Sequence, residues 1–164
     1  MIYNNIEIQL KEDMTMAYTT AENTAKWFLV RNAAEEENGA DGITNLKLQK
    51  LLYYAQGCTL ALKSTPLFDD PIVAWQHGPV VESIYRKYKS YESNPITPEE
   101  FDVSVIPAEI SNILEDVYLN FGQFSAWKLR NMTHEETPWL TTAKNGVIST
   151  AKIKKYFEEN YIES

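Results

Sequence analysis

Hydrophobic residues recur at helical spacing along most of the chain, which predicts a mainly α-helical fold. The first helix is expected within residues 19–42, where Thr19 and Glu22, three residues apart, match a capping box. Four apolar residues form its inward face: Ala21, Ala25, Phe28 and Leu29. This spacing is that of an amphipathic helix packed on a core.

The second helix is expected within residues 44–63 and is the most apolar of the chain. Thr44 is a good N-cap, and Pro66 follows the expected end. Six residues trace a stripe at helical spacing: Leu48, Leu51, Leu52, Ala55, Thr59 and Leu62. Tyr53 and Tyr54 widen this stripe, so we expect a central helix that its neighbours nearly surround.

Residues 66–79 are the least helical part of the chain. The run Ile72–Trp75 fits either a short strand or an extended loop, and Pro79 fits the first position of a new helix. Further helices are expected within 79–91, 108–122, 126–132 (capped by Ser125) and 150–162 (capped by Ser149 or Thr150). The fold class is therefore mainly α, with about six helices and room for one small ribbon of two or three β-strands.

The length of 164 residues fits one compact domain. Residues 1–16 are expected to form a leader, either weakly ordered or an edge strand, because Ile6 and Ile8 alternate with polar neighbours. Residues 17–164 are expected to form the helical domain. No stretch approaches the ~20 apolar residues that cross a bilayer, and the N-terminus lacks a secretory signal, so we expect a cytoplasmic protein without a membrane partner.

The charge of the chain limits its partners. Fifteen Lys and Arg against 23 Asp and Glu give a formal net charge of −8, which disfavours nucleic acid and favours a basic protein. One basic cluster, Arg86, Lys87 and Lys89, lies beside Tyr85 and Tyr88. It fits either a nucleic-acid contact or, more simply, a solvated helix face with its tyrosines in the core.

Signals for catalysis or metal binding are weak. His77, His134 and Cys58 are widely separated and lack the spacing of a zinc site, so we expect no metal and no cofactor. A small enzyme using Cys58, His77 or His134 stays open as an alternative, although a cysteine on an apolar helix usually packs as a small hydrophobe. Glu135 and Glu136 beside His134 fit acid–base chemistry or a solvated turn equally well.

Aromatic residues on turns are better candidates for binding. Trp75 and Trp139 lie in segments that cannot be plain helix, so each can anchor a partner or close one end of the core. His77 precedes the Gly78-Pro79 pair, where it can form part of a ligand or partner pocket or simply hold the start of a helix.

Several motifs together resemble the Panacea-domain family, which includes the SocA-type proteolytic-adaptor antitoxin and phage-associated GepA-type proteins. They are LKLQKLLYYAQG, PLFDDPIVAWQHGPVVESIYRKYK, MTHEETPW and the terminal IKKYFEE. The combination of Ala74-Trp75 and His77-Gly78-Pro79-Val80 with a downstream Thr133-His134-Glu135 and Pro138-Trp139 is specific, whereas no single piece is. The similarity extends over roughly residues 20–160.

The resemblance implies an antitoxin that neutralises a cognate toxin by direct protein contact, without catalysis. In the SocA type, the toxin is instead delivered to the ClpXP protease. Combined with the position of the aromatic residues, this gives a set of expected partner-binding residues: Trp75, His77, Gly78, Pro79, Tyr85, Tyr88, His134 and Trp139.

Overall fold

The computed structural model describes residues 16–163 and confirms a mainly α fold with one two-stranded sheet. The α-helices are α2 (Ala21–Glu36), α3 (Asn45–Lys63), α4 (Glu82–Lys87), α5 (Ala108–Phe121), α6 (Ala126–His134), α7 (Thr137–Leu140) and α8 (Thr150–Asn160). The strands are β1 (Val73–Trp75) and β2 (Gly78–Val80), and the 3-10 helices are η1 (Lys89–Tyr91) and η2 (Val103–Val105). The prediction that residues 1–16 form a weakly ordered leader or an edge strand concerns almost only residues 1–15, which lie outside the described residues.

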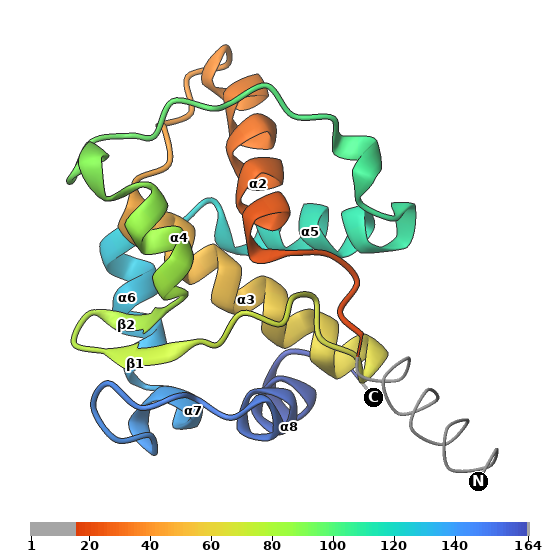
Figure 1. Cartoon of the computed structure of the whole chain (residues 1–164), viewed down its shortest axis with the longest axis vertical. Coiled ribbons are helices and arrows are strands. Elements are labelled where there is room, and N and C mark those ends of the chain that lie inside the picture. Colours follow the sequence, from red (N-terminus) through yellow and green to blue (C-terminus); the bar gives the residue numbers. More distant parts are fainter. Residues whose placement is uncertain (1–15, 164) are drawn as a thin grey trace, which may run out of the picture.

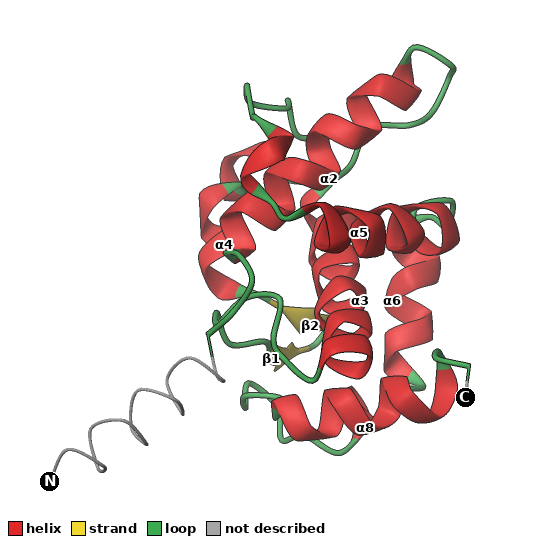
Figure 2. Cartoon of the chain, turned by 90° about the vertical axis from the view of Figure 1, so that its right-hand side faces the viewer, coloured by secondary structure: helices red, strands yellow, loops and turns green. Residues whose placement is uncertain are grey.

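Helix α3 is the centre of the fold, as its apolar stripe predicts. It crosses the middle of the molecule (Figure 1), with α5 and α8 on opposite sides and α6 alongside (Figure 2). Gly57 lets α8 approach, because a Cβ there would lie 2.4 Å from ring atoms of Phe157. Tyr53 and Tyr54 are fully buried, so the expectation of a nearly surrounded helix is confirmed.

Polar side chains on α3 fix the segments that pack around it. Gln56 accepts a hydrogen bond from Leu67 N and donates one to Phe68 O, both at 2.8 Å. About two turns earlier, Gln49 Oε1 accepts from Val81 N at 2.8 Å and Lys50 Nζ donates to Pro79 O at 3.0 Å. These buried groups satisfy the backbone of chain segments that lack regular partners, which holds the β-hairpin against the helix.

Strands β1 and β2 form an antiparallel hairpin with Gln76 and His77 at its turn, and Trp75 pairs with Gly78. The prediction that Pro79 begins a helix is wrong: it pairs with Ala74 inside β2, and the helix begins at Glu82. Gly78 has a φ of 111°, a conformation that favours glycine, so the chain reverses before proline is reached. A Gly-Pro pair is compatible with either a helix start or a strand. The contacts with α3, such as the hydrogen bond from Lys50 Nζ to Pro79 O, favour the strand.

The predicted helix caps are mostly confirmed. Thr44, Ser125 and Ser149 each accept a hydrogen bond from the backbone N–H three residues later. The capping box at Thr19 is wrong by one residue, because Thr20 accepts from Asn23 N at 3.0 Å.

Candidate functional site

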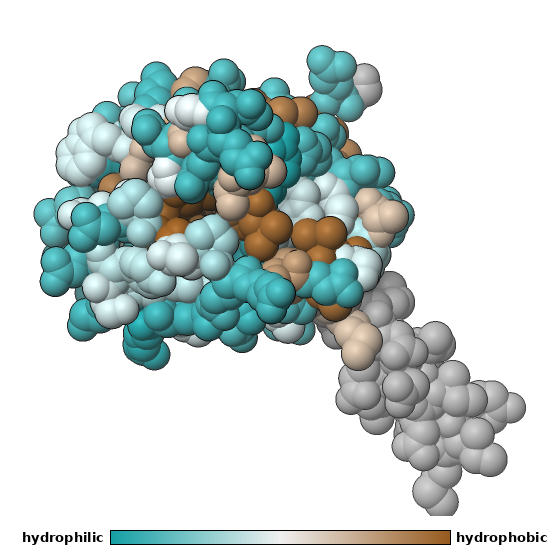
Figure 3. Space-filling view, turned by 90° about the horizontal axis from the view of Figure 1, so that it is seen from above, coloured by the Kyte–Doolittle hydropathy of each residue, from teal (hydrophilic) through white to brown (hydrophobic). Residues whose placement is uncertain are grey.

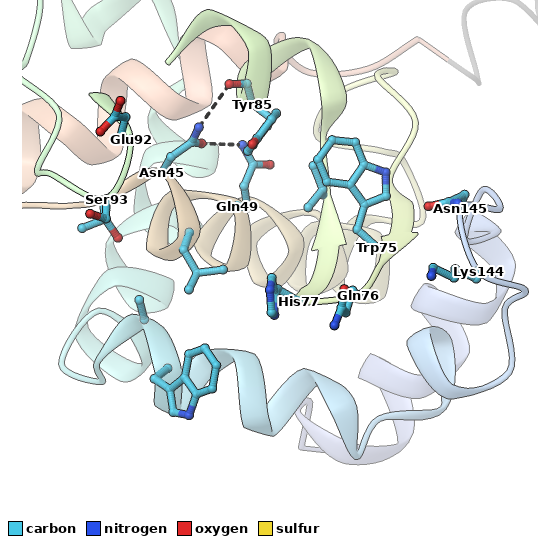
Figure 4. Close-up of a pocket in the computed structure, with 15 residues that line it drawn as sticks. Asn45, Gln49, Trp75, Gln76, His77, Tyr85, Glu92, Ser93, Lys144 and Asn145 are labelled. Atoms are coloured by element: carbon cyan, nitrogen blue, oxygen red, sulfur yellow. Dashed lines mark hydrogen bonds between the residues drawn. The ribbon is translucent and has the colours of Figure 1, made fainter. Parts of the chain in front are cut away.

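The hairpin turn and α4 bring three of the predicted residues to one groove. Trp75, His77 and Tyr85 line this cavity of about 700 Å³, which we call the hairpin groove (Figure 4). The ring centres of Trp75 and Tyr85 are 4.9 Å apart in an edge-to-face arrangement. The volume lies in the range of ligand and anchor pockets, and aromatic side chains contribute to the lining, as they usually do at such sites.

The groove has a second wall that the sequence analysis missed. Trp127, near the start of α6, lines it and is 56% exposed. The guanidinium carbon of Arg130, one turn later, lies 4.4 Å from the centre of the Trp127 ring, and the His77 ring centre is 6.1 Å from it. Nothing in the local pattern distinguishes Trp127 from a core tryptophan, because its exposure depends on how α6 sits against α3.

Polar groups close the groove on the side of α3. Asn45 donates from Nδ2 to Tyr85 O at 3.1 Å and accepts at Oδ1 from Gln49 Nε2 at 3.0 Å (Figure 4). The side-chain amides of Asn45 and Gln49 therefore form hydrogen bonds with the backbone at Tyr85 and at Val81, which links α3 to α4 and to the end of the hairpin. The exposed Gln76 and Lys144 at the opposite end have no such side-chain bonds within residues 16–163.

The other predicted site residues are not among those that line the groove. Gly78 and Pro79 are buried in β2, and Tyr88 is 3% exposed in the core, where its hydroxyl donates to Glu99 at 3.3 Å. His134 and Trp139 stack face to face with ring centres 4.0 Å apart. Tyr88, His134 and Trp139 therefore make contacts within the chain, outside the lining of the groove.

Trp139 links the two parts of the predicted site. Its indole Nε1 donates to Trp75 O at 2.8 Å, and both residues line a shallower cavity that also includes Gln76 and Lys144. The α7 tryptophan therefore fixes the strand that carries Trp75. Trp139 is partly buried against the core, as expected of a residue that closes one end of it. Trp75 instead faces a groove, as expected of a residue that anchors a partner.

A fully buried lysine lies beneath the hairpin turn. Lys50 is 0% exposed, and burial, with a contribution from the charge of Arg130, lowers its pKa to about 7. A Cβ on Gly78 would lie 2.7 Å from Lys50 Cε and 2.8 Å from Thr133 Oγ1, so glycine is required for this close approach. The amine is thus packed between the turn and α6.

Glu136 is the centre of a second buried polar cluster. It is 3% exposed and accepts hydrogen bonds from the hydroxyls of Tyr53 at 2.8 Å, Tyr54 at 2.9 Å and Tyr161 at 2.5 Å. Burial raises its pKa, and the three hydroxyl donors oppose that rise. The interpretation of Glu136 as part of a solvated turn is therefore wrong; only Glu135 is exposed. The cluster fastens the end of α8 to α3.

The structure separates the residues of the enzyme alternative. Cys58 lines a different groove, of about 670 Å³, together with Met132 and Tyr161, whereas His77 lines the hairpin groove. Burial raises the pKa of the Cys58 thiol to about 12, which keeps it protonated and a poor nucleophile. Within residues 16–163, no group of three or more His, Cys, Asp or Glu side chains is placed to hold a metal ion.

The basic cluster on α4 is largely neutralised by carboxylates of the same chain. Arg86 Nη2 lies 2.9 Å from Glu82, and Lys87 Nζ lies 3.3 Å from Glu22 and 3.2 Å from Glu99. These ion pairs favour the simpler interpretation of the cluster as a solvated helix face.

Comparison with known proteins identifies the domain. The family model for SocA-like antitoxins, the Panacea domain, matches residues 48–140, more than half of the chain. The chain belongs to this family. The matched part of the Panacea domain runs from α3 to α7 and includes both walls of the hairpin groove.

A curated relative is Antitoxin SocA of Caulobacter vibrioides, strain NA1000 / CB15N. The two are 34% identical over 109 residues, which cover 59% of this chain and 58% of the relative. The chain therefore matches little more than half the length of that protein. No solved structure matches this Panacea domain. Over residues 16–163, none of its helices combines the length and the apolar character that a bilayer span requires.

Proposed function

We propose that this Panacea domain neutralises a cognate toxin by binding it directly, and that the hairpin groove is the contact surface. The observation that carries the proposal is that Trp75, His77 and Tyr85, from β1, the turn and α4, line one open groove opposite the exposed Trp127. Large aromatic side chains around a pocket are the usual centres of binding energy in protein interfaces.

Charge supports a protein partner of basic character. The net charge of −8 accelerates encounter with a positively charged protein and disfavours nucleic acid. The surface is mainly hydrophilic on the face shown in Figure 3, with hydrophobic residues visible in its middle. The proposed action is stoichiometric and makes no covalent bond, in keeping with a Cys58 thiol that burial keeps protonated and that lines a different groove from His77.

The test compares two exposed apolar residues of nearly equal exposure. Trp127 is 56% exposed in the groove, and Leu119 is 57% exposed on α5, outside its lining. We expect Trp127→Ala to weaken toxin binding about tenfold and to reduce rescue of growth when the adjacent toxic gene is expressed, because an interface anchor is lost. Leu119→Ala should behave like the wild type in both measurements.

The level of the toxin in the same cells separates blocking from delivery to a protease such as ClpXP. Direct neutralisation predicts that the toxin persists, intact and bound, while growth recovers. A toxin that disappears only when this chain is present would identify an adaptor instead. Equal loss of binding for Trp127→Ala and Leu119→Ala would show that the contact surface lies elsewhere.

A further inference from the structure

Arg130 differs from the other arginines of the chain in having no carboxylate partner. Arg31 pairs with Glu35 and Glu115, each at 2.8 Å, and Arg86 pairs with Glu82 at 2.9 Å. Arg130 forms no ion pair within the described residues 16–163. This is unexpected in a chain whose 23 acidic residues outnumber its 15 basic ones.

The guanidinium of Arg130 is also short of hydrogen-bond acceptors. Its Nη1 donates to Asn131 Oδ1 at 3.0 Å, whereas Nε is buried without a hydrogen-bond partner. One face lies over the Trp127 ring at 4.4 Å. A stacked guanidinium with free donors is pre-organised for an oxyanion, because the ring fixes its plane while the N–H groups stay available.

Three further basic groups gather around the same turn. His134 Nε2 is buried without a partner, and Lys50 is fully buried with Pro79 O as its one acceptor within the described residues. Burial lowers the pKa of His134, and the charges of Arg130, Lys50 and His77 lower it further. The turn at Gly78 lies against Lys50, because a Cβ there would be 2.7 Å from Lys50 Cε, and both His77 and Arg130 lie beside the Trp127 ring. We call Lys50, His77, Arg130 and His134 the cationic cluster.

No acidic side chain of residues 16–163 forms an ion pair with any member of this cluster, so the charge of Arg130 has no counter-charge there, and burial favours the neutral forms of Lys50 and His134. Buried or half-buried cations are normally paired, since removing them from water is expensive. A bound anion would offset the desolvation of Arg130 and would favour the protonated forms of Lys50 and His134. The cluster adjoins the hairpin groove, whose lining includes His77 and Trp127.

We propose that the cationic cluster binds a phosphate group at the end of the hairpin groove. A phosphate offers close to two negative charges and three strong acceptor oxygens, which match several converging donors better than a single carboxylate does. The groove next to the cluster has about 700 Å³ and the aromatic rings of Trp75 and Trp127, so it has room for a planar base as well. The source of the phosphate is therefore either inorganic phosphate or a nucleoside monophosphate.

This inference is independent of whether a toxin occupies the groove, and it is tested on the isolated full chain. The readouts are the NMR resonances of Arg130 Nε–H and of the Trp127 indole N–H, during titration with sodium phosphate and with sodium chloride at equal ionic strength. We expect saturable shifts with phosphate alone. Adenosine monophosphate should bind about tenfold tighter than phosphate if the base stacks in the groove, and equally if inorganic phosphate is the ligand.

Three variants make the test specific. Arg130→Gln and His77→Gln should each weaken phosphate binding about tenfold, because each removes a charge-assisted donor. Since His77 is exposed, its variant stays informative even if Arg130→Gln does not fold. Arg86→Gln is the matched control: Arg86 is already paired with Glu82, and its loss should leave binding unchanged.

Several results would overturn the proposal. Shifts that follow chloride and phosphate equally would indicate ionic strength alone. Equal effects of Arg86→Gln and Arg130→Gln would indicate a general charge effect. Adenosine that binds as tightly as its monophosphate would show that no phosphate is recognised.

Discussion

Replacing Glu136 with alanine is expected to lower the free energy of unfolding by roughly 3–5 kcal/mol, because three buried hydroxyl donors lose their acceptor at once. Tyr53, Tyr54 and Tyr161 come from α3 and the end of α8, and all three hydroxyls converge on this carboxylate. The rings of Tyr53 and Tyr54 cannot turn to solvent easily, since both are fully buried and Tyr54 is stacked on Phe121 with ring centres 4.1 Å apart. A loss of this size is a large part of the stability of a domain of this length.

Chemical denaturation with urea measures this effect, and the neighbouring residue provides the control. Glu135 is exposed, so Glu135→Ala should change the free energy of unfolding by no more than about 0.5 kcal/mol. Glu136→Gln keeps one acceptor oxygen and should fall between the two. If Glu136→Ala proved as stable as Glu135→Ala, the cluster would not be what holds α8 to α3.

The second large effect is a dependence of stability on pH that is due to Lys50. Its pKa is about 7 in the folded chain, where it is fully buried, whereas an unfolded lysine titrates near 10.4. Between these values the unfolded chain binds the additional proton, so stability rises with pH. We expect a gain of roughly 1.5 kcal/mol from pH 7 to 8.5. Above that window the ionisation of Cys58 in the unfolded chain opposes the gain, since burial raises its pKa to about 12.

Lys50→Met should remove this gain and should be roughly 2 kcal/mol more stable than the wild type at pH 7, because a buried amine is replaced by an apolar side chain of similar length. Lys89→Met, at an exposed position, should keep the pH dependence of the wild type. Urea denaturation at pH 7.0, 7.5, 8.0 and 8.5 measures the slope for each chain. An unchanged slope in Lys50→Met would contradict a buried amine as its origin.

The helices could be predicted from the sequence, because their apolar spacing and caps are local signals. Thr44 and Ser125 begin their helices where the pattern places them. Pro79 could not be assigned correctly, because a Gly-Pro pair fits both a helix start and a strand. Its place in β2 depends on Lys50, 29 positions earlier in the chain.

The candidate site could be predicted in part, because some of its residues are close together in the sequence. Trp75, His77 and Tyr85 lie within a few positions of one another, so their convergence on one groove could be anticipated. Glu136 gave no local signal, because its tyrosine partners on α3 lie 82 and 83 positions away. Trp127 was missed because the exposure of a tryptophan on a helix is decided by the packing of that helix.

A titration with purified components tests whether the chain neutralises its proposed toxin by contact alone. The activity of the toxin is measured while the chain is added, without any protease or nucleotide present. We predict that inhibition is complete at a fixed stoichiometric ratio and that the mass of the toxin is unchanged. Inhibition by a small fraction of an equivalent, or only after a protease is supplied, would contradict direct stoichiometric neutralisation.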